Sequence, residues 1–290
     1  MIALVFGIFG LITGSFLNVI ILRRGVRSLR GRSGCMSCGA QLSWYDMVPV
    51  FSWLTLRGRC RTCGGRISVQ YPLVEAATAI LFALIGGWGG AAFITTGDFG
   101  VTLVRLITLN YLVIAALLVA IFVYDLHHTI IPDGWVYTFI ALTFLGQFLL
   151  PFWGEYGYWL FFSGPVVALP ILALWGASSI RYGTPGMWMG LGDAKLALGI
   201  GWLLGPAAGL LAVFGAFVIG AIISLVLLLF SSEQWKSITR LLTPTSISRR
   251  PAWGFTMKSE IPFGPFLIVG CLIVWFSSLF NIPIPFFPML

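Results

Sequence analysis

Long apolar runs limit what this chain can fold into more than any other feature of its sequence. Only 9% of the residues are charged, whereas an ordinary soluble domain has roughly 25%. About 20 apolar residues in a helix are needed to cross the hydrocarbon core of a bilayer. Eight runs near this length are predicted to span the membrane, at residues 1–22, 72–88, 102–124, 134–150, 159–180, 191–204, 207–230 and 263–281. The sequence therefore predicts an all-α, polytopic membrane protein.

The positions of the basic residues predict how these helices are oriented. The formal net charge of +8 could indicate a nucleic-acid partner. However, fifteen of the seventeen Lys and Arg residues lie in loops on one side of the predicted bundle, mostly within 23–71 and 231–262. Loops rich in Lys and Arg stay in the cytoplasm. We therefore expect both termini outside the cytoplasm, and anionic membrane lipid rather than nucleic acid as a partner.

Two segments are predicted to lie outside the membrane. Residues 23–71 are rich in Arg, Gly and Cys, and they separate the first helix, 1–22, from a membrane domain at 72–290. A module of about 50 residues buries little core, so we expect a metal or a disulfide to stabilise it. The second segment, 231–262, is a cytoplasmic loop whose first part is either a short helix on the bilayer surface or a solvated linker.

Four cysteines in the 23–71 module have the spacing of a structural zinc site. They form two C-x2-C pairs separated by 21 residues: Cys35, Cys38, Cys60 and Cys63. Two disulfides or a redox pair are alternative interpretations, but cytoplasmic thiols stay reduced. Four thiolates bind Zn²⁺ tetrahedrally and leave no position for a catalytic water. The spacing therefore predicts structural Zn²⁺, and catalytic groups have to come from elsewhere.

Acidic residues at the ends of spans are the candidates for chemistry, because ionisable groups in a membrane are costly. They are Glu75, Asp125, Asp133 and Asp193, which the predicted topology places on the cytoplasmic side. Asp133 follows Ile-Pro and precedes an apolar run, so we interpret it as a helix cap.

Asp125 and Asp193 are the stronger candidates. Asp125 ends a long apolar helix, where a negative charge opposes the helix dipole and no Lys or Arg follows within a turn. Asp193 could cap a helix, but Ala197 and Gly201 on the same stripe would let another helix approach closely. Two neighbouring carboxyls share one proton and can act as base and acid on a single water, as peptide hydrolysis requires.

Motifs in a fixed order run along nearly the whole chain. They are Gly14-Ser15-Phe16-Leu17-Asn18-Val19, the two C-x2-C pairs, Tyr71-Pro72-Leu73-Val74-Glu75, Asp125 with Ile131-Pro132-Asp133, Gly190-Leu191-Gly192-Asp193-Ala194-Lys195-Leu196, and Ile261-Pro262-Phe263-Gly264-Pro265. This set resembles the bacterial type IV prepilin peptidases, which are leader peptidases and N-methyltransferases.

The resemblance implies that Asp125 and Asp193 are the catalytic pair of an aspartic endopeptidase. It implies a prepilin or pseudopilin substrate, with a basic leader that ends in Gly and a hydrophobic helix after it. Cleavage would occur at the cytoplasmic face of the bacterial inner membrane. The resemblance also implies N-methylation of the product with S-adenosylmethionine. No Gly-rich nucleotide loop marks a site for this cofactor, so Glu75 and the 23–71 module are its candidates.

Two other functions are weighed against this interpretation. A peptidase without methylation, like the archaeal preflagellin peptidases, would share the Asp pair but would not be expected to carry the cysteine module. A transporter or channel would place charges near the bilayer midplane and usually show repeated halves. The carboxylates of this chain lie at one membrane edge instead.

Overall fold

Helices form at all eight predicted spans in the computed structural model of the chain, which describes residues 1–24, 31, 33–95, 99–149, 157–182, 189–229 and 262–282. They are α1 (Ile2–Arg23), α3 (Gln70–Gly89), α4 (Phe99–His128), α5 (Asp133–Leu149), α6 (Gly157–Tyr182), α7 (Leu191–Leu204), α8 (Pro206–Leu229) and α10 (Gly264–Leu279). Within these described ranges the structure has no named strand, so the predicted all-α fold is confirmed.

Five of the helices are long and apolar enough to cross a membrane: α1, α3, α4, α6 and α8. The prediction of a multi-pass membrane protein is therefore confirmed. The other three, α5, α7 and α10, hold 17, 14 and 16 residues. These lengths are below the roughly 20 residues that a straight span needs, so the count of eight spans stays a prediction.

The chain divides into two compact units. The first comprises Met1–Gly87 and Val226–Ser259, and the second comprises Trp88–Leu225 and Glu260–Leu290. The loop predicted at 231–262, with its two interpretations, lies outside the described residues except for Pro262. The domain boundaries predicted at residues 22 and 71 stay a prediction.

Glycines bring α1 and α3 of the first unit into close contact. A Cβ added at Gly10 would lie 2.6 Å from the Cα of Ala79, and one added at Gly14 would lie 2.7 Å from the Cα of Glu75. Small residues one turn apart allow two membrane helices to approach in this way. As a result, the polar face at the end of α1 lies directly against the start of α3. Along the chain, the cysteine module lies between α1 and α3. It contains two short helices, η1 (Trp44–Met47) and α2 (Phe51–Thr55).

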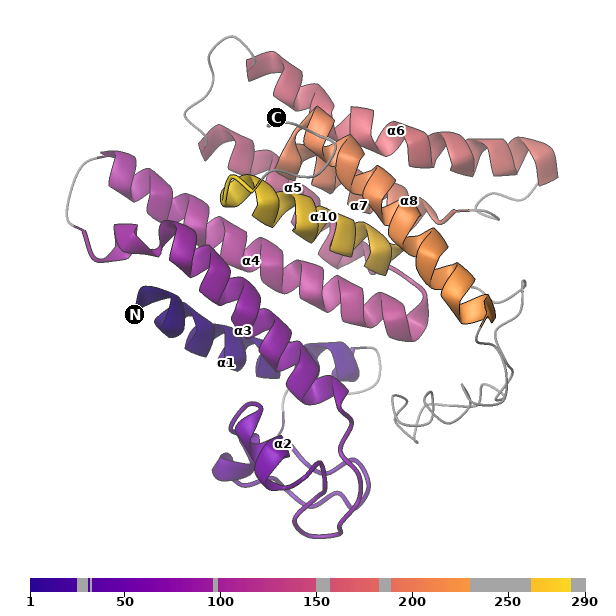
Figure 1. Ribbon diagram of the computed structural model, residues 1–290. Coiled ribbons are helices and arrows are strands. Elements are labelled where there is room, and N and C mark those ends of the chain that lie inside the picture. The colour runs from indigo at the N-terminus through magenta and orange to yellow at the C-terminus, as the bar shows by residue number, and fades with distance from the viewer. Residues whose placement is uncertain are drawn as a thin grey trace. The chain divides into compact units, whose positions relative to one another are not determined.

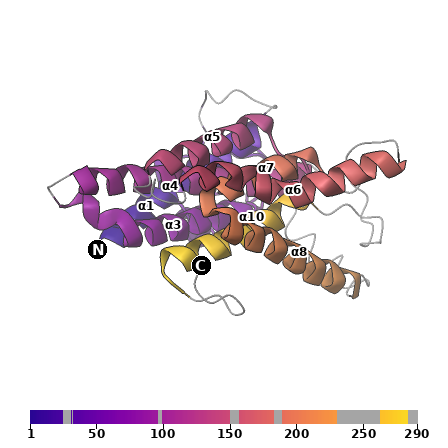
Figure 2. The same ribbon diagram turned by 90° about the horizontal axis from the view of Figure 1, so that it is seen from above.

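Helix α7 lies at the centre of the second unit. It packs against α5, α6 and α10, while α4 packs against α5 and α10 (Figures 1 and 2). Leu196, Ala197 and Ile200 of α7 are fully buried. Gly201 lets α6 approach, because a Cβ there would collide with the carbonyl oxygen of Ser163. Neighbouring helices therefore cover α7, which explains how a helix too short to span the bilayer alone is accommodated.

Candidate active site and metal centre

Asp125 and Asp193 come together in the second unit. Asp125 lies in the last turn of α4 and is 3% exposed, and Asp193 lies in the first turn of α7 and is 9% exposed. The negative charge of Asp125 acts on the carboxyl group of Asp193, so the two groups are electrostatic neighbours. The fold thus brings together the two carboxyls that the sequence singled out.

Each of these carboxyls accepts a hydrogen bond from a backbone N–H group. Gly264, the first residue of α10, donates to Asp125, and Gly190, just before α7, donates to Asp193. The N-termini of α7 and α10 therefore both lie against the pair. Because the N-terminus of a helix carries a partial positive charge, this arrangement favours negative charge on the carboxyls.

Ile131, Gly192 and Gly264 enclose this pair. A Cβ added at Gly264 would collide with Oδ2 of Asp125 and lie 3.2 Å from Cδ1 of Ile131, while one at Gly192 would lie 3.2 Å from Cβ of Ile131. All three residues belong to motifs noted in the sequence, but nothing local in those motifs assigned them a role. Their role depends on the meeting of α4, α7 and α10.

On the peptidase activity that the motif resemblance implies, Gly264→Ala should lower the cleavage rate strongly, because the added Cβ would displace the Asp125 carboxylate. Displacing a catalytic group by about 1 Å can cost about 100-fold in rate, and we expect a loss of that order. The measurement is the cleavage rate at matched membrane expression. Gly215→Ala is the matched control, because nothing lies within 4 Å of a Cβ at that position of α8. Equal activity of the two variants would contradict the prediction.

Asp133 has a partner that the sequence did not reveal. It is the first residue of α5, and its Oδ1 accepts a hydrogen bond from Nζ of Lys195 at 2.5 Å. The same Nζ lies 4.8 Å from the ring centroid of Tyr137. The ion pair joins the start of α5 to the start of α7, two residues from Asp193. A negative charge in the first turn also suits the helix dipole, and the predicted capping role of Asp133 stays a prediction.

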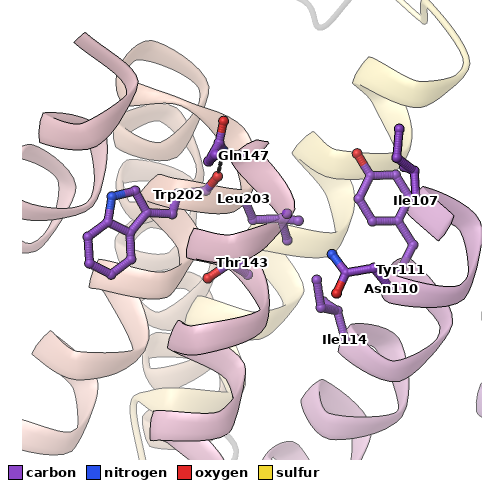
Figure 3. Close-up of a pocket in the computed structure, with 9 residues that line it drawn as sticks. Ile107, Asn110, Tyr111, Ile114, Thr143, Gln147, Trp202 and Leu203 are labelled. Atoms are coloured by element: carbon purple, nitrogen blue, oxygen red, sulfur yellow. Dashed lines mark hydrogen bonds between the residues drawn. The ribbon is translucent and has the colours of Figure 1, made fainter. Parts of the chain in front are cut away.

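Figure 3 shows a small cavity in the second unit, which neither Asp125 nor Asp193 lines. Asn110 lines it and precedes Asp125 by fifteen residues on α4, which corresponds to about 22 Å along the helix. Polar side chains around this cavity join helices, since Asn110 donates to the carbonyl oxygen of Leu142 at 3.3 Å and Gln147 donates to that of Trp202. We interpret the cavity as structural.

The four cysteines of the module form a group that can hold a metal ion. Their sulfur atoms all lie within 4.8 Å of one another, and Sγ of Cys35 lies 3.8 Å from Sγ of Cys63. Thiolates at about 2.3 Å from a tetrahedral Zn²⁺ are about 3.8 Å apart, so the spacing fits this metal. The structure joins none of these four cysteines in a disulfide.

Both C-x2-C pairs adopt the same backbone conformation. In each pair the first Cys donates its N–H to the carbonyl oxygen five residues later, at 2.9 Å from Cys35 and 2.8 Å from Cys60. The glycine after the second Cys, Gly39 or Gly64, has a φ of 72° or 69°, which other residues rarely adopt. These turns direct both thiols of a pair to the same side.

Hydrogen bonds distribute protons unequally among the thiols. The backbone N–H groups of Cys38 and Ser37 stabilise the Cys35 thiolate and lower the pKa of this thiol to about 6. At Cys63 the N–H of Gly65 favours the thiolate, but the neighbouring thiols, Cys38 first, outweigh it and raise the pKa to about 11. Thiols this close compete for protons, and a bound cation favours their deprotonated forms.

Glu75, the sequence-based candidate for a cofactor site, belongs to the first unit. It is 6% exposed on α3, and its Oε2 accepts a hydrogen bond from the backbone N–H of Val50 at 2.7 Å. Ser15 of α1 hydrogen-bonds to the same carboxyl group. The carboxyl is therefore held between α1, α3 and the start of α2.

Fold and site define a multi-pass helical membrane protein with a buried carboxyl pair and an extramembrane metal-binding module. The chain belongs to the type IV leader peptidase family, whose family model matches residues 112–225. Residues 8–87 match the model described as the bacterial peptidase A24 N-terminal domain. The two matches fall within the second and the first compact unit, respectively. The resemblance drawn from the motifs is confirmed.

Several relatives carry the name prepilin leader peptidase/N-methyltransferase. The chain is 30% identical to that of Bacillus subtilis (strain 168), over 74% of this chain and 79% of the relative. It is 27% identical to that of Aeromonas hydrophila, over 94% of this chain and 90% of the relative. The match to that of Myxococcus xanthus (strain DK1622) has 43% identity but covers only 34% of the relative. No solved structure matches the chain.

Proposed function

We propose that this protein is an aspartic endopeptidase that cleaves the leader peptide of prepilins or pseudopilins after Gly and N-methylates the new N-terminus. The single observation that supports cleavage most directly is the buried pair of Asp125 and Asp193 beside the N-termini of α7 and α10. Membership of the type IV leader peptidase family gives this pair its substrate class.

The two carboxyls divide the work of peptide hydrolysis. Because they are buried and interact, they hold one proton between them near neutral pH. The ionised carboxyl removes a proton from a water molecule, which attacks the carbonyl carbon of the leader Gly at the scissile bond. The protonated carboxyl stabilises the developing oxyanion and then protonates the leaving amine. The N–H groups of Gly190 and Gly264 orient the two carboxyls during this exchange.

The Arg-rich loops support a location in the bacterial inner membrane, with the active site and the cysteine module on the cytoplasmic side. This side also holds the basic leader of the substrate before cleavage. Zn²⁺ fits the four thiols of the module, where it would be structural. S-adenosylmethionine would supply an activated methyl group, and the 23–71 module with Glu75 is the candidate region for methyl transfer.

A two-part assay tests the proposal with protein purified in detergent. Wild-type protein should cleave a prepilin peptide and methylate the product. The Asp125→Asn variant should not cleave, but should methylate a pre-cleaved peptide at close to the wild-type rate, because methyl transfer does not need the Asp pair. Failure of wild-type protein to cleave would refute the peptidase. Cleavage without methylation by the wild-type protein would show that it is a peptidase without methyltransferase activity. Loss of both activities in the folded Asp125→Asn variant would show that the two activities share residues.

A further inference from the structure

A second buried carboxylate lies outside the Asp pair. Glu75 is 6% exposed, and among the described residues it takes part in neither of the ion pairs Arg61–Asp46 and Lys195–Asp133. A buried carboxylate without a cation is costly, and it persists where a cation binds or a proton is exchanged. Its two hydrogen bonds, from the Val50 N–H and from Ser15, leave further lone pairs available.

Asn18 on α1 provides an unused acceptor on the same helix pair. This residue is 1% exposed, and its Nδ2 donates to the carbonyl oxygen of Tyr71 at 3.2 Å. Because a carbonyl oxygen can only accept, this bond fixes which end of the amide is the oxygen. Its Oδ1 is buried and has no hydrogen-bond partner among the residues that the structure describes. A buried acceptor without a donor is rare and indicates a further partner, such as a water, an ion or a ligand.

The two acceptors belong to one stretch of the α1 and α3 contact. Gly14 packs against Glu75, while Asn18, one turn further along α1, bonds to Tyr71, one turn earlier on α3. Ser15 lies between Gly14 and Asn18 and bonds to Glu75. A buried carboxylate and a buried amide oxygen on adjacent turns of one helix contact favour a ligand with several N–H donors and a positive charge. An ammonium group has both properties.

We propose that Glu75 and Asn18 bind the free α-amine of the cleaved pilin, and that Glu75 accepts its proton before methyl transfer. This inference rests on the proposed function. The product of cleavage is a hydrophobic helix that begins at its own N-terminus, so its amine lies at the membrane edge. Glu75 also lies at a membrane edge, five residues after the start of α3.

Proton transfer to Glu75 comes before transfer of the methyl group. The ammonium gives one proton to the Glu75 carboxylate and becomes a neutral amine. The amine nitrogen attacks the methyl carbon of S-adenosylmethionine, so that an N–C bond forms and the S–C bond breaks. The electron pair of the S–C bond stays on sulfur, which leaves S-adenosylhomocysteine and an N-methylammonium. Glu75 finally releases its proton to water.

Glu75→Gln separates this role from a purely structural one. The Gln oxygen still accepts the Val50 N–H, so the contact that holds the start of α2 is kept, but the amide cannot take a proton or balance a cation. Thr78→Val is the matched control. Thr78 is also buried on α3, and its hydroxyl donates a hydrogen bond to the carbonyl oxygen of Val74 on the same helix.

The experiment measures four quantities for full-length wild-type, Glu75→Gln and Thr78→Val proteins. They are cleavage of a prepilin peptide, methyl transfer to a pre-cleaved peptide, binding of that peptide with a free or an acetylated N-terminus, and binding of S-adenosylhomocysteine. Wild-type and Thr78→Val proteins should bind the free amine about tenfold or more tighter than the acetylated form, as one charge-assisted hydrogen bond requires. Glu75→Gln should cleave normally, lose this preference and lose methyl transfer.

Several outcomes would overturn the inference. One is a Glu75→Gln protein that keeps the amine preference. Another is a variant that loses binding of S-adenosylhomocysteine while the amine preference persists, which would assign the site to the methyl donor. Loss of the preference in Thr78→Val as well would assign the effect to helix packing. A wild-type protein without cleavage would refute the proposed function, an outcome that the cleavage assay reports independently of amine binding.

Discussion

Asp125→Asn and Asp193→Asn should each abolish prepilin cleavage while the protein stays folded and inserted in the membrane. Each substitution keeps the size of the side chain but removes the ability to share a proton, so the pair no longer supplies both a base and an acid to one water. General acid–base catalysis contributes about 100-fold to 10,000-fold, and we expect a loss at the upper end, since both functions fail together. The cleavage rate at matched membrane expression measures this effect.

The double variant should be no worse than either single variant, because residues that act as a unit lose their contribution together. Asp133→Asn is the matched control. The Asn oxygen still accepts a hydrogen bond from Lys195 and Asn is also a good helix cap, so substantial activity should remain. An active Asp125 or Asp193 variant, or an inactive Asp133 variant beside an active Asp125 variant, would move the catalytic pair elsewhere.

Substituting any one of the four module cysteines should remove the metal. In Cys60→Ser, for example, three thiolates remain, and a four-coordinate structural site loses most of its affinity when one ligand is missing. We expect the metal content of purified protein to fall from about one zinc per chain to near zero, and the 23–71 module to become sensitive to protease. The membrane helices should stay inserted, because their apolar length and not the metal determines insertion.

Cys271→Ala provides the control for this experiment. Cys271 is fully buried in α10 of the second unit and does not belong to the four-cysteine group, so the metal should be retained. Elemental analysis under reducing conditions measures the metal, and limited proteolysis measures the order of the module. A wild-type protein without zinc, or a Cys60→Ser protein that keeps a full equivalent, would refute the assignment.

Local patterns in the sequence were sufficient to predict the positions of the helices and the grouping of the four cysteines. The predicted spans begin and end within three to four residues of the observed helices, and 191–204 agrees with α7 at both ends. Apolar runs are local, and their length alone determines where a helix can cross a bilayer. The C-x2-C pairs are also local, because each turn places its two thiols together without help from distant residues.

Only the tertiary structure determined which residues, distant in the sequence, contact the polar side chains of the candidate sites. The sequence marked Asp125 and Asp193 as costly charges, but the N–H of Gly264 on Asp125 depends on α10 packing against α4. Likewise, Lys195 is 62 residues from Asp133, so no helical spacing relates the two. The unpartnered oxygen of Asn18 is visible only once α1 and α3 are in contact. A helical period relates residues one turn apart, whereas these partners are set by how helices pack, which no local pattern records.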